Sequence, residues 1–150
     1  ALRQPLAPGG DPLVHIVRAF VLPVMQAQGS EAGLAYARLI ARETSDPREA
    51  DRGIVQDYFD PFGMEFIRAI EQALPRQNHD YAHWAYLFAV GALVMSVFDR
   101  RIERLSAGTI RAGDIEHKAE YLVTFIVAGI RAGSLNPDTG TTLPCSGGSH

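Results

Sequence analysis

The chain has 150 residues, the size of one domain and enough to bury a core without disulfide bonds or metal ions. Hydrophobic residues make up 47% of it, which excludes a disordered or fibrous protein. The formal net charge is −3, which excludes a strongly basic surface for binding nucleic acid. Its single cysteine, Cys145, cannot form an internal disulfide bond, so we expect a reducing, cytoplasmic environment.

The first segment is expected to be a linker followed by a helix. Residues 1–10 contain two prolines and two glycines, which favour irregular structure. Asp11 followed by Pro12 predicts a helix start, because aspartate caps free N–H groups and proline suits the first helical position. Apolar residues then recur every three or four positions from Leu13 to Val24, and Pro23 inside this pattern predicts a kink or the end of the regular helix.

Two further helical segments follow. Ser30 is placed to cap a helix over residues 31–44. Asp46 and Pro47 repeat the start signal for a helix whose apolar residues extend to Ile70. The pair Asp60 and Pro61 interrupts this helix, so either it kinks there or Asp60 caps a new segment that ends before Pro75.

The central segment, residues 78–104, is the most apolar part of the chain. Between Trp84 and Phe98 the only polar side chain is Ser96, so a helix here must be buried on every face. This run of 15 residues is shorter than the ~20 that a membrane span requires, and charged residues flank it. We therefore expect no membrane association, and a central helix covered on one side by its own chain and on the other by a second copy.

The last helix is predicted to start after Asp114 and to end at Gly133 in the left-handed conformation. It is apolar from Leu122 to Ile130 except at Thr124. Residues 134–150 are expected to be a flexible tail. The sequence thus predicts an all-α domain over residues 11–133, a bundle of five to six helices.

Sequence motifs for catalysis are missing. HExxH, GxSxG, CxxC, GxxxxGK[ST], GxGxxG and ExxH do not occur, which argues against an enzyme and gives no reason to expect a cofactor. His79 and His83 would share a helical face, but no third metal ligand can be identified, so no metal site is predicted.

Aromatic and methionine side chains from several segments suggest a ligand pocket. Two of these segments carry an internal proline, and a bundle that opens around a cavity needs such breaks more than a solid core does. The alternative for each residue is ordinary core packing. The expected lining, between the first helix, the Pro61 break and the first half of the central helix, is Phe20, Met25, Tyr36, Tyr58, Phe59, Phe62, Phe66, Trp84 and Phe88.

The order of these features resembles the C-terminal effector-binding and dimerisation domain of the TetR family of bacterial transcription regulators. The resemblance rests on DPLVHIVRAFVLPVM, YARLIARETSDP, YFDPFGMEFIRAIEQALP, the W-x-x-x-F-x-x-G-A pattern from Trp84 to Ala92, and YLVTFIVAGIRAG, which together cover residues 11–133. It implies that a helix-turn-helix domain of the intact regulator precedes residue 1 and binds DNA, whereas this chain does not. It also implies a homodimer and a small lipophilic effector.

The resemblance implies dimerisation through the last two long helices, where small residues would let helices approach closely. The expected interface residues are Gly91, Ala92, Met95, Ser96, Leu122, Phe125, Ile126 and Gly129. Two other readings stay open: a structural dimerisation module whose aromatic residues fill a solid core, and a helical enzyme, which would need an acid/base pair that the sequence does not reveal.

Overall fold

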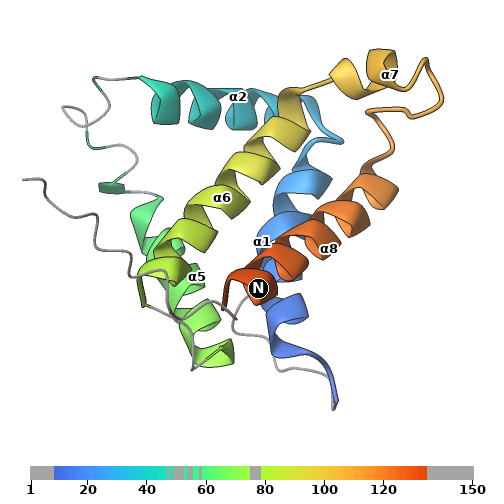
Figure 1. Ribbon diagram of the computed structural model, residues 1–150. Coiled ribbons are helices and arrows are strands. Elements are labelled where there is room, and N and C mark those ends of the chain that lie inside the picture. The colour runs from blue at the N-terminus through green and yellow to red at the C-terminus, as the bar shows by residue number, and fades with distance from the viewer. Residues whose placement is uncertain are drawn as a thin grey trace, which may run out of the picture.

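The computed structural model describes residues 9–46, 48, 53, 56–57, 59–74 and 79–134, with a few side chains of α2 and that of His79 left out. These residues form six helices and contain no strand, which confirms the all-α prediction (Figure 1). The helices are α1 (Pro12–Ala27), α2 (Glu31–Ser45), α5 (Asp60–Ala73), α6 (His79–Phe98), α7 (Arg101–Leu105) and α8 (Ile115–Ser134).

Three helix starts, those of α1, α2 and α8, lie where the capping signals predict them, and at the start of α8 the carboxylate of Asp114 accepts a hydrogen bond from the N–H of His117. The carboxylate of Asp11 accepts a hydrogen bond from the backbone N–H of Leu13, and Pro12 occupies the first position of α1. The hydroxyl of Ser30 accepts from the N–H of Gly33 at the start of α2. These side chains satisfy N–H groups that have no partner inside the helix.

The two internal prolines have different outcomes. Helix α1 continues through Pro23 to Ala27 as one α-helix. At the second break a new helix begins: α5 starts at Asp60, has Pro61 in its first turn and ends at Ala73. Asp60 is not its cap as expected, because Phe59 occupies the N-cap position and no side chain forms a capping hydrogen bond there. The helix start expected at Asp46 and Pro47 lies largely outside the described residues, although Asp46 itself ends α2.

Two predicted helix ends were wrong. The central helix does not run to Arg104: α6 stops at Phe98, and Asp99 accepts a 2.8 Å hydrogen bond from the N–H of Arg101 at the start of α7. Gly133 does not end α8 in the left-handed conformation, since the helix includes it and reaches Ser134. A β-carbon at Gly133 would lie 1.9 Å from the ring of Tyr81, so this glycine makes room for α6.

The core forms around α1. Helix α1 packs against α8, α5 and α2, and α6 packs against α8 and α5, so that α6 and α8 lie side by side (Figure 1). The largest fully buried side chains are Leu13, Val17, Val21, Met25, Phe66 and Ile70. Helix α8 adds Leu122, Val123, Ile126, Val127 and Ile130 to the same core.

Candidate functional site

Helix α6 presents its large apolar side chains to the outside of the protomer. The side chains that it buries are mostly small: Ala82, Ala85, Ala89 and Leu93. Its exposed side chains include Trp84, Leu87, Phe88 and Met95. The rings of Trp84 and Phe88 stack with their centroids 6.0 Å apart. Since small residues face the core and aromatic residues face solvent, the outer side of α6 resembles a surface that a partner covers.

A second apolar stripe on α8 continues this surface. Tyr121 and Phe125 are exposed and one helical turn apart, and Gly129 follows one turn later. The hydroxyl of Tyr81, on α6, donates a 2.6 Å hydrogen bond to the carbonyl of Gly129, which joins the two stripes. We call the exposed surface formed by Trp84, Phe88, Gly91, Met95, Tyr121, Phe125 and Gly129 the α6–α8 face.

The predicted interface residues divide between this face and the core. Gly91, Met95, Phe125 and Gly129 lie on the α6–α8 face, and Ala92 and Ser96 are partly buried beside it. Leu122 and Ile126 are buried in the protomer's own core, because they lie on the side of α8 that packs inward. Sequence reasoning missed Tyr121 on this face and assigned Trp84 and Phe88 to the pocket.

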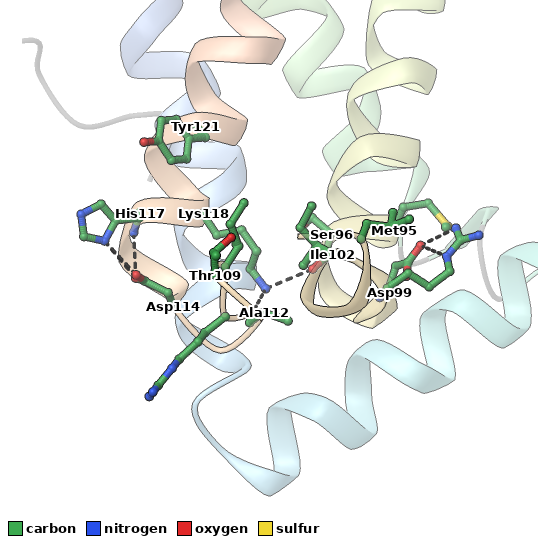
Figure 2. A pocket seen from close by; sticks show the side chains of 14 residues that line it. Met95, Ser96, Asp99, Ile102, Thr109, Ala112, Asp114, His117, Lys118 and Tyr121 are labelled. Carbon is green, nitrogen blue, oxygen red and sulfur yellow. Dashed lines mark hydrogen bonds and ion pairs between the residues drawn. The ribbon is translucent and has the colours of Figure 1, made fainter. Parts of the chain in front are cut away.

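A cavity of about 940 Å³ lies between the end of α6, α7 and the start of α8 (Figure 2). Its apolar walls are Met95, Ile102, Leu105, Ile110 and Tyr121, whose side chains are 40% to 75% exposed. Met95 and Tyr121 also belong to the α6–α8 face, so the cavity opens at the edge of that face. Its polar lining includes Asp99, Arg101, Asp114, His117 and Lys118.

Lys118 crosses the cavity from α8 to α6, as Figure 2 shows. Its ammonium group donates hydrogen bonds of 3.1 Å to the carbonyl oxygens of Ser96 and Ala112 and to the side-chain oxygen of Gln28. Burial, with a smaller contribution from the positive charge of Arg100, lowers the pKa of Lys118 below its ordinary value. All three N–H donors are thus used, and each acceptor is a neutral oxygen.

The two carboxylates in the cavity lining have partners of their own. Asp99 binds the guanidinium group of Arg101, which holds the pKa of this carboxyl below its ordinary range. Asp114 lies 3.0 Å from the ring nitrogen Nδ1 of His117, and the hydrogen bond from that ring is the largest cause of its lowered pKa. Neither carboxylate forms a hydrogen bond to Lys118.

The region where the sequence predicts a pocket contains packed aromatic rings. The ring centroids of Phe20 and Phe66 are 4.5 Å apart, and Tyr86 lies 6.4 Å from the first and 6.0 Å from the second. Phe66 is fully buried, as is Met25. The rings of α1, α5 and α6 therefore contact one another in the core.

The remaining predicted lining residues are not gathered in this cluster. Phe62 is 70% exposed on α5, and Trp84 and Phe88 lie on the outer side of α6. Phe59 is partly buried just before α5. Tyr58 and the side chain of Tyr36 lie outside the described residues. Among the predicted lining residues that the structure describes, ring contacts join Phe20 to Phe66 in the core and Trp84 to Phe88 on the outer side of α6, and the two pairs are separate.

The cavity at α7 could not be found by a periodic pattern, because Ile102, Leu105 and Ile110 lie in a short helix and a loop. One compositional signal was present: Lys118 is the only lysine among 14 basic residues. Within the described part of the chain, no group of three or more histidine, cysteine, aspartate or glutamate side chains could hold a metal ion. His83 is exposed on α6, and the side chain of His79 is not described.

Helix α6 has 20 residues and is longer than the apolar run of 15 residues from Trp84 to Phe98, whose length argued against a membrane span. By length and composition alone, Asp80–Phe98 could cross a membrane, and only 22% of that stretch is buried within the protomer. A core helix of a soluble protein passes the same test, so this feature shows only that much of α6 lacks cover inside one protomer.

The comparison with protein families shows what this chain is similar to. The model described as "Tetracyclin repressor-like, C-terminal domain" matches residues 18–129, about three quarters of the chain. Comparisons with curated proteins and with solved structures gave no match. The matched region begins within α1 and ends within α8, so it includes the α6–α8 face and the cavity. The chain belongs to the family of tetracycline-repressor-like C-terminal domains, which are the effector-binding and dimerisation domains of transcription regulators.

Proposed function

We propose that this domain forms a homodimer through the α6–α8 face and senses a small lipophilic effector for a cytoplasmic transcription repressor. DNA would be bound by a separate N-terminal helix-turn-helix domain of the intact regulator. Effector binding would then act on DNA indirectly, by changing the distance between two such domains. In this proposal the chain carries no catalytic activity and needs no cofactor.

The observation that carries the proposal is that α6 turns its small side chains to the core and its large apolar side chains to solvent. A helix that buries alanines and exposes Trp84 and Phe88 leaves most of its apolar surface in water. The exposed positions 84, 88, 91 and 95 recur every three or four residues, the spacing at which helices pack side by side in bundles. Two copies related by a twofold axis would cover both faces, because such an interface uses the same patch on each subunit.

Sedimentation velocity tests the dimer. We expect the unmodified chain to sediment as a dimer at about 10 µM, since a stable interface should bury more than ~1,000 Å². The change Phe125→Glu should give a monomer, because the twofold axis places two charged groups in one apolar interface.

Phe62→Glu is the matched control, because Phe62 is also 70% exposed but lies on α5. It should leave the dimer intact. A monomeric unmodified chain, or equal behaviour of the two variants, would reject the proposed interface.

A second candidate function is a dimerisation module without a ligand. The direct packing of Phe20 on Phe66 favours it, since these rings fill space that a pocket would need. Native mass spectrometry of the purified chain distinguishes the two functions. A small molecule that accompanies the dimer supports sensing, whereas a dimer that binds none of a panel of lipophilic compounds supports the structural module.

A further inference from the structure

The cavity at α7 combines an apolar wall with charged groups, among which Lys118 donates hydrogen bonds only to neutral oxygens of the described residues, and this combination specifies a class of ligand. Its volume of about 940 Å³ falls within the ~300–1,000 Å³ of typical small-molecule sites. Ile102, Leu105 and Ile110 line it, are exposed and lie outside the α6–α8 face, so an apolar molecule placed there would remove their surfaces from water.

Lys118 is the polar group that could select the head of such a molecule. Its ammonium nitrogen contacts three neutral oxygens, and the two carboxylates of the lining are engaged by Arg101 and His117. In the part of the chain that the structure describes, no carboxylate forms an ion pair with Lys118, and a partly buried cation of this kind gains free energy when an anion comes within hydrogen-bonding distance. The cavity therefore favours a negative head group over a neutral or positive one.

The acceptors of Lys118 also indicate how an anion would enter. An ammonium group has three N–H donors, so a carboxylate must replace at least one of the present acceptors. The carbonyl oxygens of Ser96 and Ala112 belong to the backbone, whereas the acceptor from Gln28 is a side-chain amide that can rotate away. Gln28 follows the last residue of α1 and precedes α2, so its release would alter the contact between this corner and α8.

We infer that the cavity between α6, α7 and α8 binds an amphipathic carboxylate, with its apolar chain against Ile102 and Leu105 and its head group on Lys118 in place of Gln28. This inference deepens the proposed function and rests on it, because it names the chemical class of the effector and its site. The site is distinct from the aromatic region between α1, α5 and α6.

Three compounds with the same ten-carbon chain test the head-group preference. Binding of decanoate, decan-1-ol and decyltrimethylammonium to the chain is measured by isothermal titration calorimetry below the critical micelle concentrations. We expect decanoate to bind roughly 10–100-fold more tightly than decan-1-ol, because the ammonium group of Lys118 would donate to a charged carboxylate in the first complex and to a neutral hydroxyl in the second. Equal affinities, or tighter binding of the cation, would overturn the inference.

Variants then place the ligand in this cavity. Lys118→Met keeps the length of the side chain and should remove the preference for decanoate over decan-1-ol, whereas Lys118→Arg should keep it. Gln28→Leu should strengthen decanoate binding, because the competing acceptor is gone. A preference that survives Lys118→Met, or a weaker decanoate affinity of Gln28→Leu, would contradict the assignment.

If Lys118→Met fails to fold, substitutions of two exposed leucines, one in the cavity wall and one outside it, test the site instead. Leu105→Asp adds a negative charge to the cavity wall and should weaken decanoate binding about tenfold or more, whereas Leu39→Asp on α2 should not. Equal effects of the two changes would reject this site. Native mass spectrometry of the same samples reports the dimer separately, so failure of the inference and failure of the proposed dimer are distinguishable.

Discussion

The change Phe66→Ala tests whether the aromatic residues between α1, α5 and α6 form a packed core or the wall of an open pocket. Phe66 is 1% exposed, and its ring lies 4.5 Å from that of Phe20 and 6.0 Å from that of Tyr86. Burying a phenylalanine removes roughly 150–250 Å² from water, which at ~25 cal/mol per Å² corresponds to about 4–6 kcal/mol. The alanine side chain recovers part of this, so we expect a loss of about 3–5 kcal/mol in the free energy of unfolding.

Urea denaturation followed by circular dichroism measures this loss. All samples are compared at one protein concentration, because dimerisation would add to the apparent stability. Phe62→Ala is the matched control on the same helix: its side chain is 70% exposed, and its removal should change the free energy of unfolding by less than about 0.5 kcal/mol.

A domain of this size is stable by only about 5–15 kcal/mol, so Phe66→Ala could unfold it. Phe66→Leu then serves as the milder change and should give a smaller loss in the same direction. If Phe66→Ala costs less than about 1 kcal/mol, the ring does not fill a packed core. The pocket predicted from the sequence would then be the better description of this region.

Two other predictions concern helix contact and pH. Gly133→Ala should lower the melting temperature, because its β-carbon would meet the ring of Tyr81. Gly113→Ala should not lower it, because a β-carbon there would meet nothing within 4 Å and Gly113 lies outside the α6–α8 face. The hydrogen bond from the N–H of Ala112 is the largest cause that lowers the pKa of Glu103 in the folded protein. The charged form of Glu103 therefore stabilises the fold at pH values above its ordinary pKa of 4.5, and this stabilisation is lost as the pH falls through the lower pKa of the folded state. Glu103→Gln should therefore reduce the loss of stability measured between pH 5 and pH 3, and an unchanged loss would contradict this role.

The sequence alone was sufficient for features that depend on neighbouring residues. The caps at Asp11, Ser30 and Asp114 use hydrogen bonds that reach only two or three positions along the chain. Helical periodicity likewise predicted the core stripe of α1, because Leu13, Val17 and Val21 share one face of the helix. The all-α class followed from these short-range signals together.

The orientation of α6 required the tertiary structure. Almost every residue from Trp84 to Phe98 is apolar, so periodicity cannot tell which side faces the core. Packing against α5 and α8 decides it, because the small side chains Ala85 and Ala89 allow close contact and turn the aromatic side chains outward. For this reason the sequence could predict that α6 is apolar on every face but not which side faces outward: it placed Trp84 and Phe88 in one pocket with Phe66, whereas in the protomer both are exposed and Phe66 is buried.

The cavity at α7 is likewise a product of tertiary structure. Lys118 joins Ser96, 22 residues earlier, and Gln28, 90 residues earlier, through hydrogen bonds that no local pattern encodes. Its walls come from a helix of five residues and a loop, where apolar side chains have no periodic neighbours. The sequence determined the long helices and where most of them begin, because caps and periodicity depend on nearby residues. The packing of α6 against α8 decided where the apolar surface and the charge of Lys118 meet, because these residues are far apart in the sequence and only folding brings them together.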